Sequence, residues 1–107
     1  MSFSKPANGV IFSDNKKEKE FNSLSEEDWL KKAIIDFKEN AFCGESIRKK
    51  QIPKGYIKKY GIANLWWYPL PNAWRLLYSI LTPSRTEVLT VIVDYMDHKD
   101  YERRFKY

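Results

Sequence analysis

The residues with the clearest chemical potential lie near the C-terminus, in the run Asp97-His98-Lys99-Asp100-Tyr101-Glu102-Arg103-Arg104-Phe105, which contains the only histidine. This run follows an apolar, strand-like stretch from Val88 to Met96. Acid, base, phenol and cation groups that follow one strand gather at one end of a sheet. They are suited to chemistry on a phosphate, because His98 can transfer protons near neutral pH while the cations bind oxygens. Asp97 or Asp100 can orient the imidazole, although a histidine in this position can equally be a cap or surface residue.

Arg75 and Tyr101 are two further catalytic candidates. A guanidinium group binds phosphate oxygens through two N–H groups and keeps its proton, although Arg75 can alternatively form a cross-strand ion pair with Glu87. Tyr101 follows His98 by three residues, so the two would share a face of a tail helix. Its hydroxyl can bond a phosphate, and its ring can equally well pack in the core.

The net charge of +5 is concentrated in one segment, since no Asp or Glu occurs from Ser46 to Thr86. Such a segment attracts polyanions, so nucleic acid is the first partner to consider, and a solvated basic surface is the alternative. Arg103 and Arg104 can also bind phosphate, or they can form local ion pairs with Asp100 and Glu102. The predicted RNA-binding residues are Lys49, Lys50, Lys54, Lys58, Arg103 and Arg104.

The composition predicts one globular domain over residues 1–107, with a flexible or loosely packed N-terminus at residues 1–9. The chain is 43% hydrophobic and 16% aromatic, more aromatic than a disordered chain of its charge. No apolar run is long enough for a membrane span or a signal peptide, so we expect a cytoplasmic protein without a membrane partner. Cys43 is the single cysteine and has only His98 as a soft co-ligand, so neither a metal site nor a cofactor is expected.

The first half of the chain predicts a strand, two helices and a basic connector. Val10 to Phe12 forms the strand, and Asp14 caps a short helix with Phe21 and Leu24 as its apolar contacts. The second helix runs from Glu26 to Asn40, with a capping box at Ser25 and Asp28 and a stop at Gly44. The connector from Ile47 to Tyr60 is irregular, with a short helix near Tyr56.

The second half predicts three strands and the tail helix. They are Leu65 to Leu70, Trp74 to Leu81 and Glu87 to Met96, and Pro69 suggests an edge position or a bulge for the first. In the second strand one face carries Trp74, Leu76, Tyr78 and Ile80, and the opposite face carries Arg75, Leu77 and Ser79. In the third strand a single face carries Leu89, Val91, Val93 and Tyr95. Trp66 and Trp67 point to opposite faces, so one is free to stack on an RNA base or fill an antitoxin groove. The expected fold is α+β and two-layer, with the N-terminal helical hairpin packed on a mainly antiparallel sheet.

Four features together resemble the RelE/ParE superfamily of toxins, most closely the RelE and HigB type. They are the helical pair, Ile52-Pro53-Lys54, Trp74-Arg75-Leu76-Leu77-Tyr78, and the strand that ends at Asp97-His98-Lys99-Asp100-Tyr101. The resemblance covers roughly Val10 to Phe105. It implies a toxin that enters the ribosomal A site, cuts messenger RNA without a metal and is restrained by an antitoxin protein. By position, the resemblance implies that Arg75, His98 and Tyr101 surround the scissile phosphate. It also implies that Lys50 and Lys54, in the basic connector, contribute positive charge.

Many members of the superfamily carry a second arginine where this chain has Trp66-Trp67-Tyr68. The alternative is therefore a non-catalytic toxin-like domain, which inhibits a target as ParE does or binds only antitoxin or RNA. A generic RNA-binding module is a third hypothesis.

Overall fold

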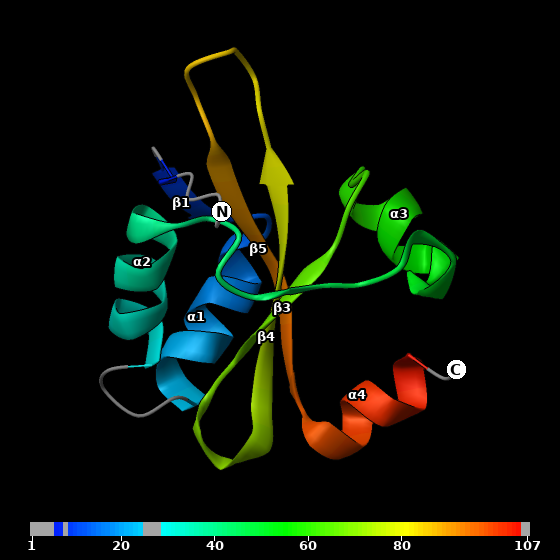
Figure 1. The fold of residues 1–107 in the computed structure, drawn as a ribbon. Helices are drawn as coiled ribbons and strands as arrows, with labels where there is room; N and C mark the ends of the chain where they lie inside the picture. Colours follow the sequence, from blue (N-terminus) through cyan, green and yellow to red (C-terminus); the bar gives the residue numbers. More distant parts are fainter. Residues whose placement is uncertain (1–5, 8, 25–28, 106–107) are drawn as a thin grey trace.

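The computed structural model describes residues 6–7, 9–24 and 29–105. Within these residues the chain forms a five-stranded sheet of order β1-β5-β4-β3-β2 together with four α-helices (Figure 1). The strands are β1 (Gly9–Phe12), β2 (Glu45–Ser46), β3 (Trp66–Pro69), β4 (Trp74–Leu81) and β5 (Leu89–Asp97). The helices are α1 (Asn15–Leu24), α2 (Trp29–Glu39), α3 (Lys54–Tyr60) and α4 (His98–Arg104), with 3-10 turns η1 (Lys49–Gln51) and η2 (Pro71–Ala73). None of the described helices is long and apolar enough to cross a membrane.

The predicted α+β class and the mainly antiparallel sheet are confirmed. β1 pairs with β5 in parallel, whereas β2–β3, β3–β4 and β4–β5 are antiparallel. The strand predicted from Trp74 to Leu81 has the same bounds in the structure. Pro69 lies where β3 has only β4 beside it, because β2 pairs with Trp66 and Trp67 alone, so the predicted edge position is also confirmed.

Helices lie on both faces of the sheet (Figure 1). α1 and α2 cover one face, where Phe21, Phe37, Leu76 and Tyr78 belong to a buried cluster that we call the first core. α3 and α4 cover the other face over the second core, whose buried residues are Ile47, Ile52, Ile62, Leu65, Leu77, Val91, Val93, Met96, Tyr101 and Phe105. The N-terminal helical pair therefore packs on the sheet as predicted. The second helical layer was not expected, and it forms because β5 is apolar on both faces, with Val91, Val93 and Met96 in the second core.

A β-bulge interrupts the pairing of the two central strands. Leu77 lies opposite Asp94 and Tyr78 opposite Ile92, so Val93 is an extra residue in β5. A bulge of this kind bends the strand and redirects the side chains that follow it.

The bulge corrects one prediction about β5. Val91 and Val93 pack in the second core, whereas Tyr95 packs against the first. The predicted common face of Leu89, Val91, Val93 and Tyr95 is therefore wrong, because the extra residue reverses the alternation after Val93.

The N-terminal predictions are tested only in part. Asp14 caps α1, since its Oδ1 accepts a hydrogen bond from the Lys16 N–H at 2.8 Å. The capping box at residues 25 and 28, the first residues of the second predicted helix and the Leu24 side chain lie outside the described part. Most of the predicted loose segment, residues 1–9, also lies outside it. Within that segment Ala7 is buried and donates a hydrogen bond to the Phe37 carbonyl at 2.9 Å.

Gly44 allows a close approach between strands and is not the predicted helix stop, because α2 ends at Glu39. Its N–H donates to the Tyr78 hydroxyl oxygen at 3.0 Å. A Cβ at this position would lie 2.3 Å from the Trp67 carbonyl oxygen and 2.7 Å from the Tyr78 hydroxyl oxygen. Any side chain larger than hydrogen must therefore push these groups apart.

We expect Gly44→Ala to destabilise the protein by about 2 kcal/mol, because the backbone of β3 must move to admit the methyl group. Gly55→Ala is the matched control. Gly55 lies in α3, and no atom lies within 4 Å of the position that its Cβ would take, so alanine there should stabilise the helix by about 0.5 kcal/mol. Urea unfolding of both variants measures the difference, and equal midpoints would contradict it.

Candidate functional site

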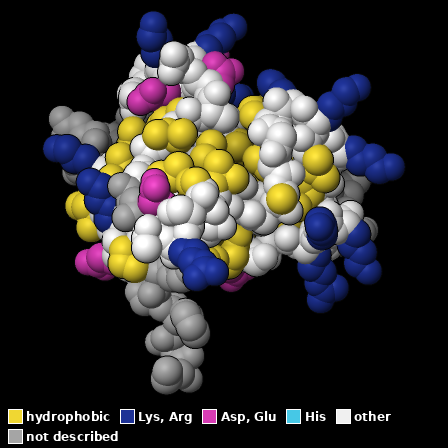
Figure 2. All heavy atoms as spheres, turned by 90° about the horizontal axis from the view of Figure 1, so that it is seen from above, with side chains coloured by type: hydrophobic (Ala, Val, Ile, Leu, Met, Phe, Trp, Pro, Cys, Tyr) yellow, Lys and Arg dark blue, Asp and Glu magenta, His cyan; other side chains and the backbone are white. Residues whose placement is uncertain are grey.

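Exposed cations line the segment that leads from β2 through α3. They are Arg48, Lys49, Lys50, Lys54, Lys58 and Lys59, which we call the cationic face. Within the described residues none of them forms a salt bridge. Figure 2 shows many Lys and Arg side chains, and few Asp or Glu, on the side that carries α3 and α4 in Figure 1. The predicted RNA-binding lysines 49, 50, 54 and 58 all lie on this surface.

Local sequence explains how α3 presents these lysines. Pro53 is the N-cap of the helix with φ −57°, and Gly61 ends it in the left-handed conformation with φ 63°. Tyr56 and Tyr60 pack against the second core and hold the helix down. The lysines between these anchors consequently project into solvent.

Arg75 lies on the same face of the sheet as α3, next to two aromatic rings. Its guanidinium carbon is 4.1 Å from the centroid of the Trp67 ring and 4.1 Å from that of the Tyr101 ring. The two rings are inclined by 59° with centroids 6.3 Å apart, so they form a wedge that contains the guanidinium.

The alternative partner of Arg75, Glu87, does not reach it. Arg75 pairs with Met96 in the ladder, at the opposite end of β4 from the Leu81–Leu89 pair. Among the described residues Arg75 has neither a salt bridge nor a side-chain hydrogen bond, so its cationic group is available to an anion from outside the chain.

Tyr101 and His98 lie three residues apart on α4, as predicted, but they occupy different environments. Tyr101 is 3% exposed and stacks on Phe105 with centroids 4.5 Å apart. The His98 side chain is 48% exposed. Because Tyr101 is covered by the second core, its ring supports Arg75 instead of presenting a hydroxyl beside the histidine.

His98 pairs with a carboxylate that sequence reasoning missed. Its Nε2 lies 2.9 Å from Glu102 Oε1, an i,i+4 spacing that the sequence does display. Asp97 instead caps α4, accepting from the Asp100 N–H at 2.9 Å, and Asp100 lies 3.6 Å from Arg103. Neither predicted aspartate therefore orients the imidazole.

The imidazole borders a shallow hollow of about 380 Å³ at the end of β4 and β5. Asn72 and Ala73 on its rim both have positive φ, 59° and 62°. The hollow leaves His98 open to a ligand, while Arg75 does not line it. The lining residues are Asn72, Ala73, Trp74, Asp97, His98 and Lys99.

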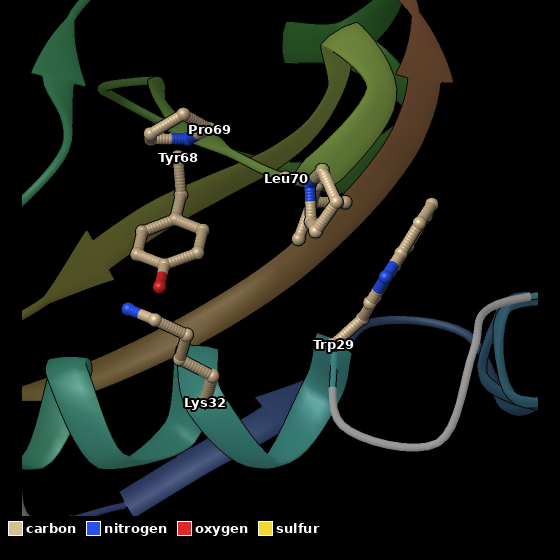
Figure 3. Close-up of a pocket in the computed structure, with 6 residues that line it drawn as sticks. Trp29, Lys32, Tyr68, Pro69 and Leu70 are labelled. Carbon is tan, nitrogen blue, oxygen red and sulfur yellow. The ribbon is translucent and has the colours of Figure 1, made fainter.

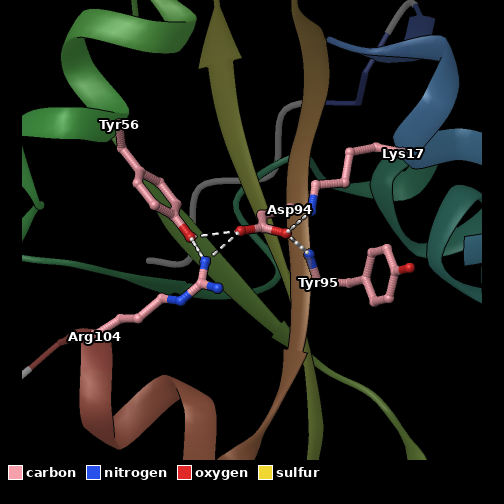
Figure 4. A network of polar contacts seen from close by, with 5 residues as sticks. All are labelled: Lys17, Tyr56, Asp94, Tyr95 and Arg104. Atoms are coloured by element: carbon pink, nitrogen blue, oxygen red, sulfur yellow. Dashed lines mark hydrogen bonds and ion pairs between the residues drawn. The ribbon is translucent and has the colours of Figure 1, made fainter. Parts of the chain in front are cut away.

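Asp94 is the centre of a buried polar network that sequence reasoning also missed (Figure 4). Its side chain is 4% exposed, and it lies 3.0 Å from Lys17 Nζ and 3.2 Å from Arg104 Nη1. The Tyr56 hydroxyl donates to the same carboxylate, and Arg104 donates to the Tyr56 oxygen at 3.0 Å. The signal in the sequence is a carboxylate inside an otherwise apolar strand, which needs partners when it is buried, but alternation does not identify those partners.

The network gives one of the C-terminal arginines an internal partner that the sequence did not predict. Arg104 binds Asp94 and Tyr56 through Nη1, while its side chain remains 51% exposed. Arg103 pairs with Asp100, as the local ion-pair alternative proposed.

The network also shifts the pKa values of Tyr56 and Lys17. Burial and the hydrogen bond to Asp94 raise the pKa of Tyr56. Burial by itself would lower the pKa of Lys17, but the hydrogen bond to Asp94 and its charge outweigh burial and raise that pKa.

A separate apolar hollow of about 260 Å³ lies between α2 and β3, next to the first core (Figure 3). The Tyr68 hydroxyl on its wall donates to Asp36, which also pairs with Lys32. The hydrogen bond from Tyr68 lowers the pKa of Asp36. The hollow can accept an apolar side chain, and its lining residues are Trp29, Lys32, Tyr68, Pro69, Leu70 and Pro71.

We expect Asp94→Asn to lower the free energy of unfolding by about 2 kcal/mol, because it leaves two cations and a phenol without their common anion. Asp100→Asn is the control, since its pair with Arg103 is exposed and should contribute less than about 0.5 kcal/mol. Urea unfolding at pH 7 measures both. A loss from Asp100→Asn as large as that from Asp94→Asn would contradict the central role of the network.

Stability should also fall at alkaline pH. The unfolded chain loses its tyrosine protons near pH 10, whereas folded Tyr56 keeps its proton because its pKa is raised. This contribution is complete below about pH 10 and is lost as the pH rises above it. In Tyr56→Phe the decline should be shallower by up to about 1.4 kcal/mol per pH unit. Urea unfolding between pH 8 and 11 tests this, and parallel curves for the two proteins would refute it.

No protein-family model, curated protein or solved structure shows a significant match to this chain.

Proposed function

We propose that this chain is a toxin of the RelE/ParE type that binds RNA through the cationic face, cuts messenger RNA on the ribosome without a metal and is restrained by an antitoxin protein. The observation that carries the proposal is the placement of unpaired cations. The cationic face and Arg75 lie on one face of the sheet, and none of these groups has a carboxylate partner among the described residues. Cations without internal anions are the signature of a surface that binds phosphates.

The topology supports the same proposal. Apart from the two-residue strand β2, the elements follow in the order on which the resemblance rests, namely a strand, a helical pair, a basic connector, three antiparallel strands and a tail helix. The RelE-like arrangement is part of the proposal, as are the ribosome, the messenger RNA and the antitoxin as partners.

The proposed chemistry uses His98, which borders the hollow at the end of the sheet, and Arg75, which lies outside that hollow, so the RNA must extend from one to the other. His98, held by Glu102, takes the proton of the ribose 2′-hydroxyl while the 2′-oxygen bonds to the neighbouring phosphorus. The bond from phosphorus to the 5′-oxygen breaks, that oxygen takes a proton from water, and a 2′,3′-cyclic phosphate remains. Arg75 stabilises the charge on the phosphate oxygens. Lys50 and Lys54 bind the flanking backbone. Tyr101 contributes through its ring and does not transfer a proton in this scheme.

A second candidate is a non-catalytic domain that inhibits its target by binding RNA or protein. The burial of Tyr101 favours it, because one of the three expected reacting groups is not at the surface. Under this proposal Arg75 and the cationic face bind RNA, and His98 has no chemical role.

Translating ribosomes incubated with the protein, in a buffer that keeps Mg²⁺ and contains a chelator of zinc and other transition metals, distinguish the two candidates. We expect cleaved messenger RNA with the wild type, and a loss of at least about 100-fold in cleavage rate with Arg75→Ala or His98→Ala. Lys31→Ala is the control, since Lys31 is exposed on α2 over the opposite face.

Each outcome assigns the function. Arrested translation with intact message, unaffected by His98→Ala, would replace the nuclease by the non-catalytic candidate. Ribosomes that continue to translate with intact message would overturn both.

A further inference from the structure

We infer that Trp67 and Tyr101 are positioning residues that hold the Arg75 guanidinium ready for a phosphodiester, so that Trp67 acts on RNA through Arg75 and not by stacking on a base. This inference rests on the proposed function and adds a role for Trp67, one of the three aromatic residues at the place where many members of the RelE/ParE superfamily carry a second arginine.

Contact geometry is the first support. The guanidinium carbon lies 4.1 Å from each ring centroid, within the range of a cation–π interaction, and two rings inclined by 59° restrict the rotation of the side chain. A restricted guanidinium loses less conformational freedom when an anion binds.

The wedge is itself well supported. Tyr101 is buried and stacked on Phe105, which is 1% exposed. Trp67 pairs with Leu77 of β4 on one side and with Glu45 of β2 on the other. Both rings are therefore positioned by elements on either side of Arg75.

The neighbouring arginines provide the contrast. Arg104 and Arg103 are neutralised by Asp94 and Asp100, whereas Arg75 has aromatic rings in place of a carboxylate. A carboxylate would occupy the N–H donors and cancel the charge. Aromatic faces attract the cation while leaving its donors free for a planar pair of oxygens.

The anion is assigned as a phosphodiester of RNA because the cationic face lies on the same face of the sheet and extends the positive charge. A chain of phosphates can reach both Arg75 and these lysines. An isolated carboxylate would use Arg75 alone.

The test combines two measurements on the full chain. The Arg75 Nε–Hε resonance is followed by NMR as inorganic phosphate is added, and binding of an oligouridylate is measured by fluorescence anisotropy at several salt concentrations. The variants are Trp67→Leu, which removes the ring; Trp67→Phe, which keeps one; and Arg75→Lys, which keeps the charge. Trp66→Leu is the control, since Trp66 packs against the first core on the opposite face.

We expect Trp67→Leu and Arg75→Lys each to weaken oligouridylate binding about tenfold. The dependence on salt should stay the same, because the number of charges is unchanged. Trp67→Phe should restore affinity to within about threefold of the wild type. A merely structural role for Trp67 would not alter the response of Arg75 to phosphate, and Arg75→Lys supplies an independent result if Trp67→Leu does not fold.

The two measurements distinguish an error in the positioning role of Trp67 from an error in the proposed function. If the wild type binds oligouridylate and Trp67→Leu binds it equally well, the positioning role is overturned while the RNA-binding proposal stands. If Arg75 responds to phosphate in a Trp67-dependent way but the protein neither binds RNA nor inhibits ribosomes, the proposed function is overturned and the positioning role stands. A stronger response to a polyglutamate peptide than to oligouridylate would overturn the assignment of a phosphodiester.

Discussion

The buried carboxylate of Asp94 is the interaction on which the arrangement of the helices depends. A carboxylate withdrawn from water must be compensated by cations and hydrogen bonds, and here these come from Lys17 of α1, Tyr56 of α3 and Arg104 of α4. The helices lie on opposite faces of the sheet, so one side chain ties both helical layers to β5. Asp94 can reach them because it follows the bulge at Val93, beyond the part of β5 that pairs with β1.

This constraint connects the core to the cationic surface. Arg104 holds α4 against β5, and α4 supplies Tyr101, one ring of the wedge around Arg75. Tyr56 holds α3, whose exposed lysines belong to the cationic face. The cations of this part of the chain thus divide into those that bind internal carboxylates and those that have none and can bind phosphate.

Much of the fold was predictable because local patterns are strong in this sequence. Apolar alternation identified β4 with its bounds, and the predicted cap at Asp14 marks the start of α1. The prediction for β5 failed at Val93 because a bulge depends on how the partner strand pairs, which alternation within one strand does not record. Gly44 was predicted to end a helix. In the structure, its lack of a side chain instead allows the backbone to approach β3 and the Tyr78 hydroxyl.

By itself the sequence determined the class of fold, the order of its elements, the acid-free basic segment and the presence of Arg75 and His98 at strand ends. Tertiary structure alone decided which cation meets which anion. Tyr56 lies 38 residues from Asp94 and 48 from Arg104, and the Arg75 wedge joins residues of β3, β4 and α4. The physical reason is that propensity and periodicity reflect neighbours along the chain, whereas the partner of a charge depends on which side chains packing brings together.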